Sequence, residues 1–416
     1  MANSLKFGNG KWATNTNTVL AYNDENENFK PLPFTFSRAS SATVVNKNGL
    51  IETVASGEPR IDFSNDVKGA LLLEPSRSNV ITDSEDISTW TNSGSLTRTY
   101  NIAVAPNGQT TADGIQDETG GTFKYVYKQV SVSANSTYSG SIFVKKVASE
   151  TNYTGLILAF YGGTTKYAYG IINSVTGTIV SADSTITPTF KVDDYGNYWR
   201  FSITATDNGS NTLCRFGVYA CLSTNGTTLS TGVSSIRTIW GAQLEAGSYA
   251  TSLINTSGSA VTRIADVCSQ TLPDVVIGQT EGSAYFEYTG NGSDNSGQRI
   301  FVLRGSSTAD RIAVFDQSGK IRIYVSDGGG LQLDTTTNVD TVSTHKVAFR
   351  YKLNDFKLYI DGTAIVTDST FTVPTLNSVY VGTSEGFGGT LGGNVSDVKL
   401  YDTALSDSEL QALTTL

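Results

Sequence analysis

Short segments with β-strand character, separated by turn residues, run along most of this chain. The clearest is 346–352 (KVAFRYK), in which Val, Phe and Tyr alternate with basic or small residues. Such alternation is typical of a strand with one buried face. Asp361-Gly362 lies between the β-rich runs 356–360 and 363–366, and this pair favours a hairpin because both turn positions need positive φ. The chain is therefore predicted to be all-β, built from antiparallel sandwiches.

Helix signals are confined to the last eleven residues. Ser406 can cap a helix start, and Glu409 three residues later completes a capping box. Leu405 and Leu410 occupy the two positions of a hydrophobic staple. The sequence therefore predicts one short C-terminal helix.

The composition excludes several classes of function. The 416 residues include one His and three Cys without a CxxC pair, which excludes a multi-His zinc site, a zinc ribbon and a thioredoxin-type motif. The net charge of −9 argues against nucleic acid as a partner, because such binding depends on Lys and Arg. No apolar run approaches the roughly 20 residues of a membrane span, so membrane insertion is not expected.

The N-terminal residues and the cysteines set a further constraint. Residues 1–12 (MANSLKFGNGKW) contain no apolar core of a signal peptide. An odd number of Cys fits a chain that folds in a reducing cytoplasm, and Cys214 and Cys221 are expected to be small buried residues. The weakly charged, hydroxyl-rich composition suits a protein that works outside a cell. A virus particle assembled in the host cytoplasm and released by lysis would meet both conditions, folding inside a cell and working outside one.

Three segments are predicted along the chain. Residues 1–82 are less regular and hold four of the eight Pro, whereas 83–262 and 263–416 are strand-rich blocks of single-domain size. The polar stretch 255–262 (NTSGSAVT) is a predicted linker. Residues 1–82 are too short and irregular for a core of their own.

Several segments of the first two thirds of the chain resemble structural proteins of tailed bacteriophages, that is, head fibres, tail fibres and related adhesins. The resemblance covers roughly residues 1–266. It rests on these segments, in this order: 34–54 (FTFSRASSATVVNKNGLIETV), 58–63 (EPRIDF), 69–79 (GALLLEPSRSN), 106–115 (PNGQTTADGI), 240–254 (WGAQLEAGSYATSLI) and 261–266 (VTRIAD).

This resemblance implies a protein of the virion surface, commonly a homotrimer. Residues 1–82 would anchor it to other virion proteins, of the capsid or the tail, and help it to oligomerise. The alternative is an extended arm that packs on the second domain. Linked weak sites gain effective concentration, so a trimer would raise avidity for host or mucosal glycans.

The last block resembles the laminin-G-like branch of the concanavalin A-like jelly rolls. The segments that carry this are 344–366 (THKVAFRYKLNDFKLYIDGTAIV) and 393–413 (GNVSDVKLYDTALSDSELQAL). The resemblance implies two antiparallel sheets, often with a sugar, protein or Ca²⁺ site at one rim. Residues 83–262 resemble a jelly roll of the carbohydrate-binding-module type.

Catalytic patterns are weak. Glycosidases need two facing carboxylates, but none of the acidic residues lies in the E-x-D-x-E array of glucanases with this scaffold. His345, the single His, begins a predicted strand and is expected to be a turn or strand-edge residue, and no G-x-S-x-G elbow occurs. The chain is predicted not to be an enzyme; a polysaccharide depolymerase is the alternative. The carboxylates available by count are Asp193, Asp194, Glu245, Glu281, Glu287 and Asp294.

Sugar binding is the more plausible chemistry, because sugar C–H groups pack on aromatic faces. In 195–203 (YGNYWRFSI), Trp199, Phe201 and Ile203 share one parity and are expected to face the core. Tyr198 and Arg200 would then face outward and are candidate ligand contacts. Further aromatic residues of this block are Tyr161, Tyr167, Tyr169, Tyr195 and Trp240, the last an expected core anchor.

Two loop features complete the expectations. The Gly-rich loop 383–393 carries Phe387, a third candidate ligand contact, although a plain hairpin loop is the alternative. No cofactor is expected and no residue is assigned to a metal. A structural Ca²⁺ would use oxygen ligands, and polar loops offer Asp294, Asn295, Asp327 and Asp340. A decoration or spacer protein without any ligand remains the second alternative.

Overall fold

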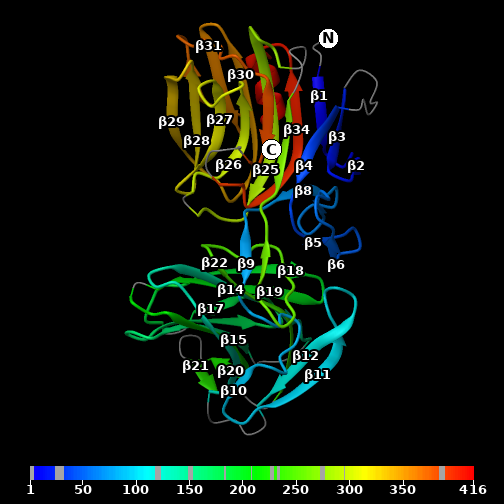
Figure 1. Ribbon diagram of the computed structural model, residues 1–416, viewed down its shortest axis with the longest axis vertical. Helices are drawn as coiled ribbons and strands as arrows, with labels where there is room; N and C mark the ends of the chain where they lie inside the picture. The colour runs from blue at the N-terminus through cyan, green and yellow to red at the C-terminus, as the bar shows by residue number, and fades with distance from the viewer. Residues whose placement is uncertain are drawn as a thin grey trace. The chain divides into compact units, whose positions relative to one another are not determined.

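The computed structural model confirms an all-β chain, with one short helix among the residues it describes (Figure 1). It describes residues 4–23, 32–117, 123–148, 153–181, 184–207, 209–224, 229–231, 235–271, 277–294, 296–383 and 389–416. The chain forms two compact units. Unit 1 consists of Met1–Lys47, Thr53–Ser76 and Ile264–Leu416, and unit 2 of Asn48–Glu52 and Arg77–Arg263. No helix among the described residues is long and apolar enough to cross a membrane.

Unit 1 is a sandwich of antiparallel strands in two layers that share β3. The first layer runs β3–β1–β34–β25–β30–β31–β32, and β8, itself paired with β7, pairs with one end of β34. Its strands are β1 (Ser4–Gly8), β7 (Ile61–Asp62), β8 (Ala70–Leu73), β25 (Glu281–Gly290), β30 (Thr344–Lys352), β31 (Asp355–Ile360), β32 (Thr363–Asp368) and β34 (Gly393–Tyr401).

The second layer runs β2–β3–β4–β24–β33–β26–β27–β28–β29. The core lies between the layers, where Phe286 of the first stacks on Phe301 of the second at 4.8 Å between ring centroids. Its strands are β2 (Thr14–Asn15), β3 (Thr18–Asn23), β4 (Leu32–Ser37), β24 (Val267–Thr271), β26 (Arg299–Arg304), β27 (Arg311–Gln317), β28 (Lys320–Asp327), β29 (Gly330–Asp340) and β33 (Ser378–Val381).

The N-terminal segment 1–82, expected to be less regular and without a core of its own, supplies strands to the sandwich of unit 1. In Figure 1 the blue strand β1 lies beside the red strand β34, and these two strands pair along all five residues of β1. Strand β4 pairs with β24 in the other layer. Phe7, Phe34 and Phe36 are buried in the same core cluster as the C-terminal strands. The alternating apolar residues of this segment therefore complete the sandwich of residues 264–416, which places the first unit boundary after Ser76 instead of near residue 82.

The predicted hairpin and helix of the C-terminal block are confirmed. Asp361 and Gly362 both have positive φ between β31 and β32. Helix α1 (Asp407–Thr414) has the capping box of Ser406 and Glu409. Leu405 and Leu410 are buried together against the outer face of the first layer.

Unit 2 is a second sandwich, with its core between a seven-stranded and a six-stranded sheet. The seven-stranded sheet runs β10–β13–β20–β15–β16–β17, with β21 paired to β20: β10 (Thr91–Ser93), β13 (Tyr125–Ser131), β15 (Tyr153–Tyr161), β16 (Lys166–Asn173), β17 (Ile179–Ser181), β20 (Leu213–Thr224) and β21 (Leu229–Thr231). The six-stranded sheet runs β11–β12–β22–β14–β19–β18: β11 (Thr97–Val104), β12 (Thr110–Gln116), β14 (Thr137–Lys145), β18 (Thr189–Tyr195), β19 (Tyr198–Thr206) and β22 (Ile236–Ala246).

Two short pairs remain: β5 (Ala42–Val45) with β6 (Ile51–Val54), and β9 (Arg77–Asn79) with β23 (Val261–Arg263). Cys214 is buried as expected, and the side chain of Cys221 lies outside the described residues.

A buried ion cluster in unit 1 joins four of the segments that carry the phage-type resemblance. Arg38 pairs with Asp266 at 3.0 Å, and Arg60 pairs with both Glu74 (2.7 Å) and Asp266. All four side chains are at most 1% exposed. Two positive and two negative charges meet, so the buried charges compensate one another, as such groups require. We call these four residues the buried ion cluster.

Candidate ligand-binding site

The structure corrects the outward orientation expected for Tyr198 and Arg200. Both are buried, because the second face of the six-stranded sheet is covered by other parts of unit 2. The Tyr198 hydroxyl donates to the Val104 carbonyl at 2.8 Å, and the Arg200 guanidinium donates to the Thr251 carbonyl at 2.6 Å. Burial raises the pKa of Tyr198 to about 12. Both side chains are therefore committed to internal contacts, and parity alone could not show that this face is covered.

The neighbouring residues follow the expectation. Phe201 and Ile203 are fully buried in the core, and Trp199 packs against it while its ring lies under Lys146, 3.7 Å from the ammonium. Trp240 is buried and donates to the Thr111 hydroxyl. Phe387 lies outside the described residues, so its role as a ligand contact stays a prediction.

The single His has a structural partner. His345 is the second residue of β30 and is 6% exposed, so it is buried at the start of the strand and not on an open edge. Its Nδ1 lies 2.6 Å from a carboxylate oxygen of Asp361, whose other oxygen accepts from the backbone N–H of Lys346. Asp361 thus connects the turn between β31 and β32 to β30.

The carboxylates considered for catalysis are dispersed over the two units, each with its own partners. Glu245 is fully buried, and burial raises its pKa although Thr251 and Gln243 donate to it. Within the described ranges, no three His, Cys, Asp or Glu side chains are grouped so as to hold a metal ion. Asn295 lies outside these ranges. The other partners are Lys191 for Asp193, Lys146 for Asp194, Lys352 for Glu281, Tyr285 for Glu287 and Ser296 for Asp294.

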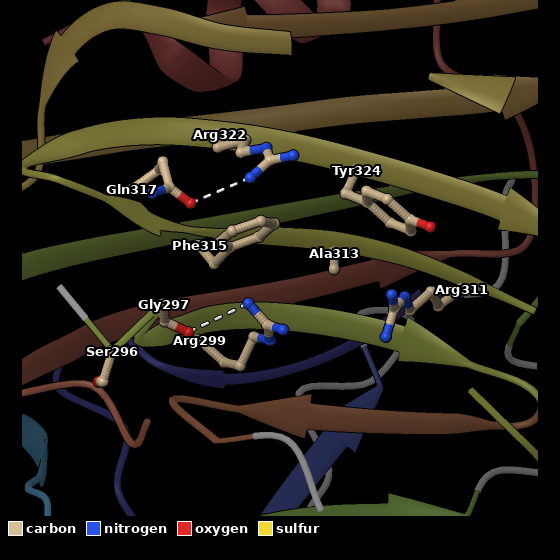
Figure 2. Close-up of a pocket in the computed structure, with 9 residues that line it drawn as sticks. All are labelled: Ser296, Gly297, Arg299, Arg311, Ala313, Phe315, Gln317, Arg322 and Tyr324. Atoms are coloured by element: carbon tan, nitrogen blue, oxygen red, sulfur yellow. Dashed lines mark hydrogen bonds between the residues drawn. The ribbon is translucent and has the colours of Figure 1, made fainter. Parts of the chain in front are cut away.

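The most notable surface feature of unit 1 is a cavity of about 380 Å³ on the outer face of the second layer. Figure 2 shows the residues that line it on β26, β27 and β28 and on the turn before β26. We call it the arginine–aromatic cavity. It is lined by Ser296, Gly297, Arg299, Arg311, Ala313, Phe315, Gln317, Arg322 and Tyr324.

Strand register explains how these side chains meet. Arg299 on β26 is opposite Phe315 on β27, and Phe315 is opposite Arg322 on β28. Two residues before Phe315 on β27, Ala313 is opposite Tyr324 on β28. Residues directly opposite on neighbouring strands share a face, so one row carries an aromatic ring between two arginines and the next a small residue beside a tyrosine.

The arginines lie over the aromatic rings. The Arg299 guanidinium carbon is 4.3 Å from the Phe315 ring centroid and that of Arg322 is 5.3 Å from it. Arg311 lies over Tyr324 at 4.5 Å. Figure 2 shows Phe315 between Arg299 and Arg322. Such stacking holds a guanidinium plane in place, which gives the cavity ordered donors as well as apolar faces.

The electrostatics of the three arginines differ. Arg322 forms a bidentate pair with Asp334, at 2.6 and 2.5 Å, and this hydrogen-bonded partner raises its pKa. Arg299 donates to the Gly297 carbonyl at 3.1 Å, and no carboxylate of the described chain forms an ion pair with it. Its pKa is lowered to about 10, first by burial and then by the charges of Arg311 and Arg322.

Sequence reasoning missed this cavity. The signal was present in 299–304 (RIFVLR), 311–317 (RIAVFDQ) and 320–324 (KIRIY), three successive strand-like runs. In the second and third, arginines and aromatic residues alternate with aliphatic residues, which places them on the face opposite the core. Only the pairing of the strands shows that the three runs bring these residues together.

Unit 2 has a second aromatic group, on the outer face of the seven-stranded sheet. Its tyrosines pack on one another and cover aliphatic residues that are themselves buried, among them Ile157 and Ile171. Arg215 lies over two of the rings, those of Tyr127 (4.7 Å) and Tyr161 (4.5 Å). This cluster stabilises the sheet. Its other members are Tyr125, Tyr153, Tyr167, Tyr169 and Tyr219.

A second cavity, of about 460 Å³, lies on unit 2 and is acidic. Glu85, Asp86 and Asp113 line it together with Tyr100 and neighbouring polar groups. Burial raises the pKa of Glu85 and of Asp113. The Asp113 carboxylate accepts from two backbone N–H groups, those of Ile87 and Asn101.

The family comparison agrees with the fold of unit 1. Residues 271–411 match the concanavalin A-like lectin/glucanases superfamily. This stretch is a concanavalin A-like domain. It confirms the laminin-G-like resemblance of the last block, and the arginine–aromatic cavity lies within the matched residues. The N-terminal strands β1–β4, β7 and β8 add to the domain from outside the matched residues.

Several solved structures are similar to parts of this chain. A carbohydrate-binding module of the Ruminococcus gnavus IT-sialidase, bound to α2,3-sialyllactose, is 20% identical, with 33% of this chain and 84% of that chain covered and a TM-score of 0.29. Domain 4 of the arabinanase AbnA from Geobacillus stearothermophilus is 13% identical (40% and 81% covered, TM-score 0.31), and mouse laminin α1 LG4–5 is 12% identical (67% and 88%, TM-score 0.25). No curated protein matches the chain.

Proposed function

We propose that this chain is a non-enzymatic structural protein of a bacteriophage virion, a head or tail fibre, that binds glycans through the arginine–aromatic cavity of its concanavalin A-like domain. It would act at the virion surface as a homo-oligomer, a trimer in the fibre arrangement. Several copies would then present the same cavity, and linked weak sites gain effective concentration.

The single observation that carries the binding proposal is the composition of the cavity. A sugar ring presents C–H groups to aromatic faces and hydroxyls to hydrogen-bonding groups. Tyr324 and Phe315 supply the aromatic surface, and three guanidinium groups and Gln317 supply the polar partners. The cavity has the size of a small-ligand site, and it opens on the sheet face away from the core.

The virion part of the proposal has separate support. The segments with the phage-type resemblance are distant in the sequence, yet Arg38, Arg60, Glu74 and Asp266 from four of them meet in the buried ion cluster. When the segments that carry a family resemblance also bring their charged residues together in the fold, they are expected to form one structural unit of that family. The anchoring role of residues 1–82 would then be exercised by a folded part of unit 1.

The non-enzymatic part rests on the carboxylates. Hydrolysis of a glycosidic bond needs two carboxyl groups about 5–10 Å apart across the bond. No Asp or Glu is among the described residues that line the arginine–aromatic cavity, and Asp334, which pairs with the lining Arg322, has both of its oxygens bound by that arginine. The cavity thus has binding groups without an acid–base pair.

The depolymerase alternative has one observation in its favour. In the acidic cavity of unit 2, Glu85 and Asp113 both have raised pKa values, as a general acid requires. Release of reducing ends from a capsule or mucin panel, abolished in Glu85→Gln, would establish this alternative. No release with the wild-type chain would leave the non-enzymatic proposal in place.

Two measurements test the proposal. Cryo-electron microscopy of the purified particle should show the chain on the capsid or the tail, and its absence from the particle would end the fibre assignment. A glycan array probed with the oligomeric full-length chain should show binding that Tyr324→Ala weakens. An array with no binding above background would favour a spacer protein without ligand.

A further inference from the structure

We infer that the glycan bound in the arginine–aromatic cavity carries an anionic group, and that Arg299 receives this group. The inference rests on the proposed glycan binding and names the class of sugar.

The arginines of the cavity lie close together although the chain as a whole is negatively charged. The protein has 38 acidic and 29 basic residues, a net charge of −9. Nevertheless three arginines, from three adjacent strands, line one cavity. Like charges in a partly buried site destabilise one another. Asp334 compensates the charge of Arg322, and an anionic ligand would offset the cost that remains at Arg299.

Arg299 has the environment of a receptor for an anion. It is 9% exposed and lies over Phe315, which fixes the plane of its guanidinium. A guanidinium has five N–H donors, and in the described chain Arg299 uses its hydrogen-bonding capacity on one backbone carbonyl, that of Gly297. Its remaining donors can bind a carboxylate or sulfate in the bidentate geometry that arginine favours.

The aromatic residues point to a sugar as the carrier of that anionic group. Tyr324 lies one row from Phe315 along the face, beside the small side chain of Ala313. A pyranose ring could pack on Tyr324 while an acidic substituent reaches Arg299. An extended polyanion without rings would use the charges and leave the aromatic surface unused. The acidic group could be a carboxylate or a sulfate ester, since both satisfy the same donors.

The test measures binding of matched oligosaccharides to the full-length chain by calorimetry. Trigalacturonate is compared with its fully methyl-esterified form, which keeps the rings and linkages but removes the charge. A sulfated dextran oligosaccharide is compared with the unsulfated one. We expect at least one acidic member to bind at least tenfold more tightly than its neutral partner. Which pair shows the difference tells carboxylate from sulfate.

The variants assign the effect to the cavity. Arg299→Gln should weaken binding of the acidic sugar about tenfold or more, and Arg311→Gln should weaken it as well. Arg215→Gln is the matched control, because Arg215 also lies over tyrosine rings but belongs to unit 2. A thermal melt of each variant verifies folding, and the ester comparison needs no variant at all.

Each remaining outcome decides against the inference. Equal binding of acidic and neutral partners, or of a neutral glycan on the array alone, overturns the anionic class while the proposed glycan function stands. Equal binding of a short polyaspartate shows simple ion exchange and overturns the sugar. A chain that binds no glycan on the array and none of these probes fails the proposed function itself.

Discussion

Two arginines of unit 1, Arg60 in the buried ion cluster and Arg299 in the arginine–aromatic cavity, are both buried but have opposite electrostatic environments. In the buried ion cluster, burial lowers the pKa of Arg60, but Asp266 and Glu74 more than offset this effect and raise it above the ordinary value. In the arginine–aromatic cavity, burial and two neighbouring arginines lower the pKa of Arg299 to about 10. The buried ion cluster has its counter-charges built in, and Arg299 does not have one in the described chain.

This difference distinguishes the structural arginines from Arg299, the proposed binding residue. A charge that is buried with its partner stabilises the fold only as a complete set, because removal of one partner leaves an uncompensated charge. A charge held beside like charges is tolerated when a ligand supplies the compensation. Substitutions in the two groups should therefore affect different measurements, and the predictions below are ordered by the size of the effect.

Deletion of residues 1–76 should have the largest effect, because it removes Arg38, Arg60 and Glu74 together with the strands that carry them. Strands β34 and β24 would lose their partners β1 and β4, and Phe7, Phe34 and Phe36 would leave the core. We expect fast amide hydrogen exchange throughout 264–416, measured by mass spectrometry. Residues 77–263, which lose Asn48–Glu52 from their unit, serve as the internal control and should stay protected. Protected β25 and β30 in the truncated chain would contradict the assignment of the N-terminal strands to unit 1.

Asp266→Asn tests the buried ion cluster with almost no change of shape. The substitution removes the carboxylate charge that pairs with both Arg38 and Arg60. Loss of one partner of a buried pair costs about 3–5 kcal/mol, and we expect a loss of this size in the free energy of unfolding of unit 1 in urea. The matched control is Asp334→Asn, which removes a carboxylate that is 29% exposed and should cost less than about 1 kcal/mol. Equal losses would show that the two groups do not differ.

Arg299→Gln should leave stability almost unchanged although the side chain is 9% exposed. It loses a stacking contact over Phe315 worth about 0.5–1 kcal/mol, and it relieves the repulsion from Arg311 and Arg322. We expect a net change within about 1 kcal/mol in the urea unfolding of unit 1, against several for Arg60→Gln, whose partners would stay buried. A loss for Arg299→Gln as large as that for Arg60→Gln would make Arg299 a structural residue.

Local patterns predicted the fold of this chain well. The alternation in 346–352 identified the core side of β30, where Val347, Phe349 and Tyr351 are buried. The turn at Asp361-Gly362 and the cap at Ser406 were visible because they depend on residues a few positions apart. The assignment of the N-terminal strands to unit 1 was not visible, because it depends on the pairing of β1 with β34, almost 400 positions away.

The candidate site was not predicted, for a related reason. Tyr198 and Arg200 had the right parity for an outer face, but other segments of unit 2 cover that face. Arg299, Arg311 and Arg322 looked like ordinary polar residues of separate strands. Their place in the cavity depends on strand register, which puts Phe315 between Arg299 and Arg322. A site assembled across strands has no signature in any one strand.

The smallest effect we predict is the pH dependence of binding. Burial and the charges of Arg311 and Arg322 lower the pKa of Arg299 to about 10, so Arg299 is charged at pH 8 and begins to lose its proton at a lower pH than an ordinary arginine. The charged groups around it are Arg311, Arg322 and the Asp334 that pairs with Arg322. As the pH rises from 8 to 10.5, some molecules lose the Arg299 charge, so the affinity for the acidic oligosaccharide should be lower at pH 10.5 than at pH 8. Calorimetry at the two pH values measures this difference. In Arg299→Gln, the affinity should change less between the two pH values. An identical pH profile in wild type and variant would assign the titration to another group and would contradict binding of the anion by Arg299.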